Sequence, residues 1–143
     1  MRGYAASLLR DKTSGGYTVT FRDVPEAITE GQTLEEARLN AVDALESALS
    51  LYIADRQALP VPSPAKRGER MVSLSALGMA KVALHEAMRE RLVGRAELAR
   101  RLGWHLAQIN RVLDLCHASK MAQVETALAA LGKRLVVDAQ DAA

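Results

Sequence analysis

The spacing of hydrophobic and polar positions changes along the chain and separates predicted strands from predicted helices. Residues 17–21 alternate between apolar and polar side chains, which is the period of a half-buried strand. Further short apolar runs predict strands at residues 4–9, 27–30 and 71–74. The glycine pair at 15–16 permits the backbone angles of a hairpin turn between the first two strands. We therefore expect a small antiparallel sheet.

A helical pattern begins directly after the third predicted strand. Thr33 and Glu36 form a capping box, in which each side chain satisfies a backbone N–H group at the start of the helix. One apolar face follows at steps of three and four residues, through Leu34, Ala37, Ala41, Leu45, Ala48, Leu49 and Tyr52. Such a face needs a packing partner, so this helix should cover the sheet.

From residue 76 onward the pattern is helical. A helix is predicted over 76–92, ended by Gly94, and another over 120–131, with Ser119 as N-cap and Gly132 as its end. Their inward positions should be Leu77, Ala80, Leu84, Met88 and Leu92, then Met121, Val124, Leu128 and Leu131. Residues 134–137 are a possible short strand. We expect an α+β chain with one domain over 1–74, a small sheet and one helix, and an all-helical domain over 75–143.

Residues 96–115 have the pattern of a helix-turn-helix. Gly103 suits the tight turn because a residue without Cβ tolerates positive φ, and Ala99 is small where the helices would cross. Buried positions are expected at Leu98, Leu102, Ile109 and Val112, with Trp104 filling the gap between the helices. Many helical hairpins share some of these features and bind nothing, but the agreement at several positions favours a DNA-binding unit.

This arrangement turns part of the second helix outward. Asn110 and Arg111 have the hydrogen-bond donors that read adenine and guanine, and Arg95 would start the first helix, where phosphate binds. The candidate DNA-binding residues are Arg95, Leu106, Ala107, Gln108, Asn110, Arg111, His117 and Lys120. Few of them form hydrogen bonds with bases, so we expect a homodimer or higher homo-oligomer on a two-fold operator.

Charge divides the chain in the same way. Residues 1–62 hold 6 basic and 9 acidic side chains, whereas residues 63–143 hold 13 basic and 8 acidic ones. The second half therefore suits a phosphate backbone better than the first. The lone Cys116 excludes an intrachain disulfide and favours a reducing cytoplasm. No apolar run approaches the roughly 20 residues of a membrane span.

Catalytic chemistry fits the sequence poorly. His85, His105 and His117 have no neighbours at metal-ligand spacing, so we expect no metal, no cofactor and no enzyme activity. The acidic residues that flank the strands would suit a magnesium-dependent nuclease, but their spacing matches no motif and a solvated acidic rim is favoured.

Two segments resemble a known family. Residues 17–21 with the following D-V-P-E-A-I-T, Gly31, Thr33 and E-E-A are similar to the first domain of HicB antitoxins, and residues 96–114 with 120–134 resemble the helix-turn-helix of one branch. Arg22 stands where the family commonly has proline. The resemblance implies a reduced ribonuclease-H-like domain without nuclease activity, which neutralises an RNA-cleaving HicA-type toxin. It also implies a second domain that represses the operon.

An RNA-binding toxin should be basic, so its contacts are expected at acidic residues of the first domain. The candidates are Asp23, Glu26, Glu30, Glu35 and Glu36. A different class of function stays open, namely a stand-alone helix-turn-helix regulator whose first domain senses a ligand or another protein.

Overall fold

The computed structural model describes residues 3–142 and has the expected α+β class. Its strands are β1 (Gly3–Arg10), β2 (Tyr17–Phe21), β3 (Ile28–Gly31) and β4 (Glu69–Ser73), and its helices are α1 (Leu34–Ala54), α2 (Ala76–Arg91), α3 (Arg95–Leu102), α4 (Leu106–Leu113) and α5 (Met121–Ala129). The strands form one antiparallel sheet in the order β3-β2-β1-β4. All four predicted strands are confirmed, with ends shifted by one or two residues.

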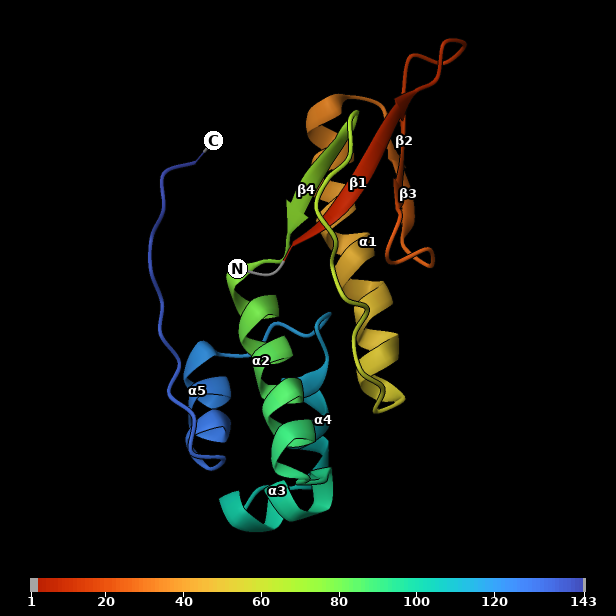
Figure 1. Cartoon of the computed structure of the whole chain (residues 1–143). Coiled ribbons are helices and arrows are strands. Elements are labelled where there is room, and N and C mark those ends of the chain that lie inside the picture. The colour runs from red at the N-terminus through yellow and green to blue at the C-terminus, as the bar shows by residue number, and fades with distance from the viewer. Residues whose placement is uncertain (1–2, 143) are drawn as a thin grey trace.

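The sheet has one covered and one open face. The cross-strand pairs Ala6–Phe21 and Leu8–Val19 belong to the face against which α1 packs. On the opposite face Ala5 is buried, but Leu9 and Ile28 are each 65% exposed. Figure 1 shows that α1 extends beyond the sheet and ends beside the helices of the second half. One helix therefore belongs to the packing of both halves of the chain.

The predicted capping box of α1 is present. The Glu36 amide donates to Thr33 Oγ1 at 3.1 Å, and Glu36 Oε2 accepts from the Gln32 amide at 3.1 Å. Gly31, at the end of β3, has no room for a side chain because a Cβ there would lie 2.7 Å from Ala37 Cα. The chain thus turns from the edge strand into α1 with the two elements in close contact.

A buried carboxylate joins α1 to the start of α2. Glu46 is 9% exposed, and its Oε2 accepts from the Ser75 hydroxyl at 2.7 Å and from the Ser75 amide at 3.2 Å. Ser75 is the N-cap of α2 and accepts from the Gly78 amide at 3.0 Å. A Cβ at position 78 would collide with the Glu46 carboxylate. A negative charge at a helix N-terminus is favourable, so this contact stabilises the joint between the two halves.

The helix predicted over 76–92 ends one residue earlier, and the inward position predicted for Leu92 is wrong. Leu92, expected to point inward, is 92% exposed and takes a left-handed conformation with φ of 56°. The helix ends at Arg91 because Val93 turns into the core, where its amide bonds to Met88 O at 2.9 Å. Gly94 is consequently the N-cap of α3 and not the end of α2.

Two predictions near the C-terminus are also wrong. Lys120 and not Ser119 occupies the N-cap position of α5, and the Ser119 hydroxyl lies within 2.9 Å of the Lys81 ammonium instead. No strand forms at residues 134–137, since this segment pairs with none of the described strands. Gly132 is left-handed as expected, although α5 itself ends three residues earlier, at Ala129.

Candidate functional site

The predicted helix-turn-helix geometry is present in α3, α4 and the turn between them. Gly103 has φ of 67°, and the following Trp104 amide bonds back to Ala99 O at 3.0 Å. Leu98, Ala99, Ile109 and Val112 are buried where the helices cross, and Leu102 and Trp104 pack against them partly buried. A positive φ is strained for any residue with a Cβ, so glycine fits this position. The two helices and the glycine turn therefore lie where the sequence pattern predicts them.

The outward face of α4 carries most of the candidate base-reading residues. Leu106 is 51% exposed, and Ala107, Asn110 and Arg111 are also exposed. The Arg111 guanidinium forms no hydrogen bond or ion pair within the described part of the chain. Its donors are thus available to an external partner.

Three other candidates have different surroundings. Gln108 is half-buried, and its Oε1 accepts from the His105 amide at 2.8 Å, which places its side chain at the N-terminus of α4. His117 is half-buried and its Nδ1 lies 3.0 Å from Ser119 Oγ. Lys120 is exposed ahead of α5, away from the α3–α4 turn in the sequence. Gln108 is on α4 with Arg111, whereas His117 and Lys120 lie between α4 and α5, so the candidates do not form one helix face.

Arg95 is the first residue of α3, as predicted, but its side chain turns inward. The guanidinium donates to Asn110 Oδ1 at 2.6 Å and to Ile53 O, near the end of α1, at 3.1 Å. Burial, and next the nearby Arg56 guanidinium, lower the pKa of Arg95. Arg95 therefore connects α1 to the outward face of α4.

Two further side chains from α2 reach the end of α1. Arg89 donates to Arg56 O at 2.6 Å, and His85 Nε2 lies 2.8 Å from Gln57 O. Arg56 and Gln57 follow Asp55, the C-cap of α1, so these contacts fix the loop that leaves the helix. The contacts of His85, Arg89 and Arg95, together with that of Glu46, hold the two halves of the chain against each other.

Lys81 is a buried residue that the sequence reasoning missed. It has no exposed surface, and its Nζ donates to the main-chain oxygens of Arg111, Asp114 and His117 at 3.0, 2.7 and 2.6 Å. Burial lowers its pKa, whereas nearby acidic groups raise it, Asp114 most strongly. Its ammonium satisfies the end of α4 and the loop toward α5. A signal was present, since position 81 lies on the apolar face between Leu77 and Leu84.

The predicted acidic contact residues fall into two groups. Asp23 is tied within the chain, because its Oδ2 accepts from the Ser63 amide at 2.9 Å and the Ser63 hydroxyl at 2.7 Å. Glu26 Oε1 accepts from the Tyr52 hydroxyl at 2.6 Å. Glu36 serves the capping box. These three carboxylates therefore have structural partners.

Glu30 and Glu35 are exposed, and no other described residue forms a hydrogen bond or ion pair with their carboxylates. Glu30 lies on the edge strand β3 opposite Thr18, and Glu35 is in the first turn of α1. Tyr52, which holds Glu26, is at the other end of α1, roughly 25 Å away along the helix axis. The five carboxylates consequently do not form one patch.

Arg22, the position that departs from the resembled family, fixes the segment before β4. Its Nε and Nη2 donate to the two oxygens of Glu69 at 3.1 and 2.8 Å, and Nη2 also donates to Pro64 O at 3.0 Å. Hydrogen bonding from Arg22 is the main cause that lowers the pKa of Glu69 to about 2. This bidentate arginine–carboxylate pair joins the end of β2 to the start of β4.

Metal and membrane sites have no support in the described part of the chain. Residues 3–142 contain no group of three or more histidine, cysteine or carboxylate side chains placed to hold a metal ion. None of the helices in this range combines the length and apolar character needed to cross a membrane.

These features define an α+β protein whose sheet-and-helix half is joined to a helical half with helix-turn-helix geometry. Residues 3–83 match the family described as HicB-like antitoxins of bacterial toxin–antitoxin systems. The chain belongs to this family.

Full-length relatives agree with the family match. The chain is 40% identical over 129 residues to Antitoxin HicB of Pseudomonas fluorescens (strain Pf0-1), covering 90% of this chain and 88% of the relative. It is 40% identical over 121 residues to Antitoxin HicB of Escherichia coli (strain K12), covering 85% and 88%. Antitoxin HicB 2 of Photorhabdus laumondii is 42% identical over 132 residues, or 92% of each chain.

Proposed function

We propose that this antitoxin neutralises a HicA-type, RNA-cleaving toxin with residues 1–74 and represses its own operon with residues 75–143. The observation that carries the proposal is the outward face of α4, next to a correctly formed turn, in a chain of the HicB family. The basic excess of residues 63–143 supports binding to a phosphate backbone.

On DNA, the outward face of α4 enters the major groove. Arg111 reads a guanine, and Leu106 and Ala107 offer apolar contact to a thymine methyl group. With so few base contacts, one copy covers too little sequence for tight binding, so two copies bind a two-fold operator. Asn110 reads a base only after its side-chain Oδ1 is released from Arg95, because Oδ1 now accepts a hydrogen bond from the Arg95 guanidinium.

We propose that Glu30 and Glu35 of this chain form the acidic contact with the toxin. Both carboxylates are exposed and have no competing partner in the chain, whereas Asp23, Glu26 and Glu36 are already hydrogen-bonded. An RNA-binding protein carries a basic surface, so these charges speed its capture and compete with RNA.

Co-expression tests the toxin half. The open reading frame next to this gene is induced alone and together with the antitoxin, and growth is recorded. We expect growth arrest alone and rescue by the antitoxin, with rescue reduced by the combined change Glu30→Lys and Glu35→Lys. Glu125→Lys, on exposed α5, is the matched control and should rescue fully. Absence of rescue, together with intact operator binding, would instead favour a stand-alone regulator.

A gel shift with the upstream region tests the DNA half. Arg111→Ala should reduce discrimination between operator and scrambled DNA by about 1–3 kcal/mol. Arg38→Ala, an exposed change on α1, should leave it unchanged. Equal behaviour of both variants would contradict the role of α4.

A further inference from the structure

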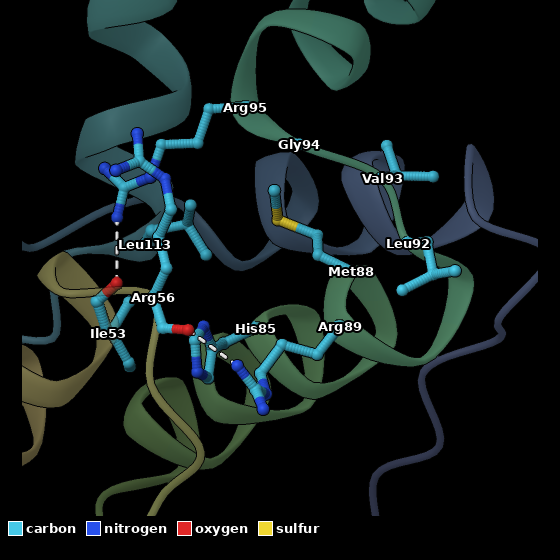
Figure 2. A pocket seen from close by; sticks show the side chains of 10 residues that line it. All are labelled: Ile53, Arg56, His85, Met88, Arg89, Leu92, Val93, Gly94, Arg95 and Leu113. Atoms are coloured by element: carbon cyan, nitrogen blue, oxygen red, sulfur yellow. Dashed lines mark hydrogen bonds between the residues drawn. The ribbon is translucent and has the colours of Figure 1, made fainter.

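A pocket lies where the end of α1, the end of α2 and the start of α3 meet. Its volume is about 320 Å³, at the lower end for small-molecule sites. Figure 2 shows the guanidinium groups of Arg56 and Arg95 on one side and Arg89 at another edge. The three arginines come from the loop after α1, from α2 and from α3, so the pocket exists only when the two halves are packed together.

The charge of this pocket is unbalanced. Three arginines and His85 line it, and none of its lining residues carries a carboxylate. The arginines act on their neighbours, since Arg56 lowers the pKa of Arg95, and Arg89 and Arg95 lower that of His85, whereas the hydrogen bond with Gln57 O and the nearby Glu86 raise it. Burial is the largest cause of both shifts. Like charges gathered in a pocket repel each other, and an anion would remove that repulsion.

Hydrogen-bond donors remain available there. The Arg89 guanidinium donates one hydrogen bond and that of Arg95 donates two, out of five N–H groups in each. The Arg56 guanidinium donates to no other described residue. In addition, Gly94 gives α3 an N-cap without a side-chain acceptor, so the first amides of this helix lack an intramolecular partner. Carboxylate and phosphate oxygens match this set of donors.

The rest of the lining is apolar. Ile53, Met88 and Leu113 are buried beneath the cationic edge, and Val93 completes this surface. Leu92 also lines the pocket and is 92% exposed, and a hydrated inorganic anion would leave its side chain uncovered. A ligand with one anionic group and a short apolar chain satisfies both parts of the pocket.

We propose that this pocket binds a small amphipathic anion, a carboxylate or phosphate monoester with a short alkyl chain. The anionic group lies between Arg56 and Arg95, with Arg89 at the other edge of the pocket, and the alkyl chain covers Leu92 and Met88. Because Arg95 also holds Asn110 Oδ1, occupancy changes the surroundings of Asn110 on the outward face of α4. A small molecule bound at this site acts at the contact between the two halves of the chain. This inference does not depend on binding of a toxin or of DNA.

The test uses the full chain, labelled with ¹⁵N, and titrates it with hexanoate and with hexyl phosphate at constant ionic strength. We expect saturable shifts of the amides of residues 93–96 and of the Asn110 side-chain amide, with one dissociation constant for both. Hexanol and inorganic phosphate serve as matched probes that carry only the apolar or only the anionic part. Each should bind at least tenfold more weakly than the complete probe. The better of the two complete probes tells whether the natural source of the anion is a carboxylate or a phosphate.

Variants test the assignment of the donors. Arg56→Gln should weaken binding about tenfold, because one charge-assisted interaction is lost. Its side chain holds no other described residue, so the fold should be unaffected. Arg91→Gln, an exposed change on α2 outside the pocket, is the control and should bind as the original chain does. Non-saturable shifts, equal losses in both variants, or a stationary Asn110 resonance would overturn the proposal.

Discussion

Replacement of Lys81 by methionine should destabilise the protein strongly, although it makes a buried position more apolar. The Lys81 ammonium donates to three main-chain oxygens at 2.6–3.0 Å, and Ser119 Oγ lies 2.9 Å away. Hydrogen bonds to a charged group are worth roughly 1.5–3 kcal/mol each, or roughly 4.5–9 kcal/mol for three. Methionine avoids the cost of burying an ammonium ion, which is several kcal/mol.

The difference predicts a net loss of about 2–4 kcal/mol in the free energy of unfolding. At roughly 3 °C per kcal/mol for a chain of this size, the melting temperature should fall by about 6–12 °C. Urea unfolding followed by circular dichroism measures the free energy, and amide exchange of residues 114–119 should become faster than in the original chain. Lys120→Met, an exposed change, is the control and should stay within about 0.5 kcal/mol. A loss below about 1 kcal/mol, or one equal to that of the control, would refute the reasoning.

Two further predictions concern the arginine–carboxylate pair and the tight turn. The pKa of Glu69 is about 2 when folded, below its ordinary 4.5, so its contribution to stability is present above pH 4.5 and is lost as the pH falls toward 2. Arg22→Gln should make urea midpoints depend less on pH in this window, and an unchanged slope would argue against the pair. Gly103→Ala should cost roughly 1–2 kcal/mol in the same assay because φ is 67°. Gly94→Ala has open space and negative φ and should cost little, so equal effects would contradict the turn argument.

Elements with a strong local pattern were predictable from the sequence. The alternation at residues 17–21, the capping box of Thr33 and the glycine turn at 103 each depend on neighbours within a few positions, and all three are present. Local backbone preferences and short-range hydrogen bonds determine such features. The open and covered faces of the sheet follow from the same alternation.

The wrong predictions arise where a distant residue changes a local preference. Ser119 has the composition of an N-cap, but its hydroxyl lies beside the Lys81 ammonium, 38 residues away. Leu92 fits the apolar period of α2, yet burial of Val93 ends the helix earlier. Val136 and Val137 are β-branched, but their segment finds no described strand to pair with.

The candidate contact residues show the same limit. From the sequence alone, Asp23 and Glu26 are charged side chains without partners. Only the fold shows that Ser63 donates a hydrogen bond to Asp23 and Tyr52 donates one to Glu26. Likewise, Arg95 was predicted at the start of α3, but its contact with Ile53 O depends on how the two halves pack. Exposure of a charged side chain is therefore a property of the tertiary structure and not of the pattern.

The most direct test of the central claim is a cleavage assay with purified components. The protein encoded next to this chain is incubated with labelled RNA while the antitoxin is added in increasing amounts. We predict that cleavage falls in proportion to added antitoxin and stops at a fixed stoichiometric ratio, and that the combined Glu30→Lys and Glu35→Lys variant requires a higher concentration. Undiminished cleavage in the presence of excess folded antitoxin would contradict the account.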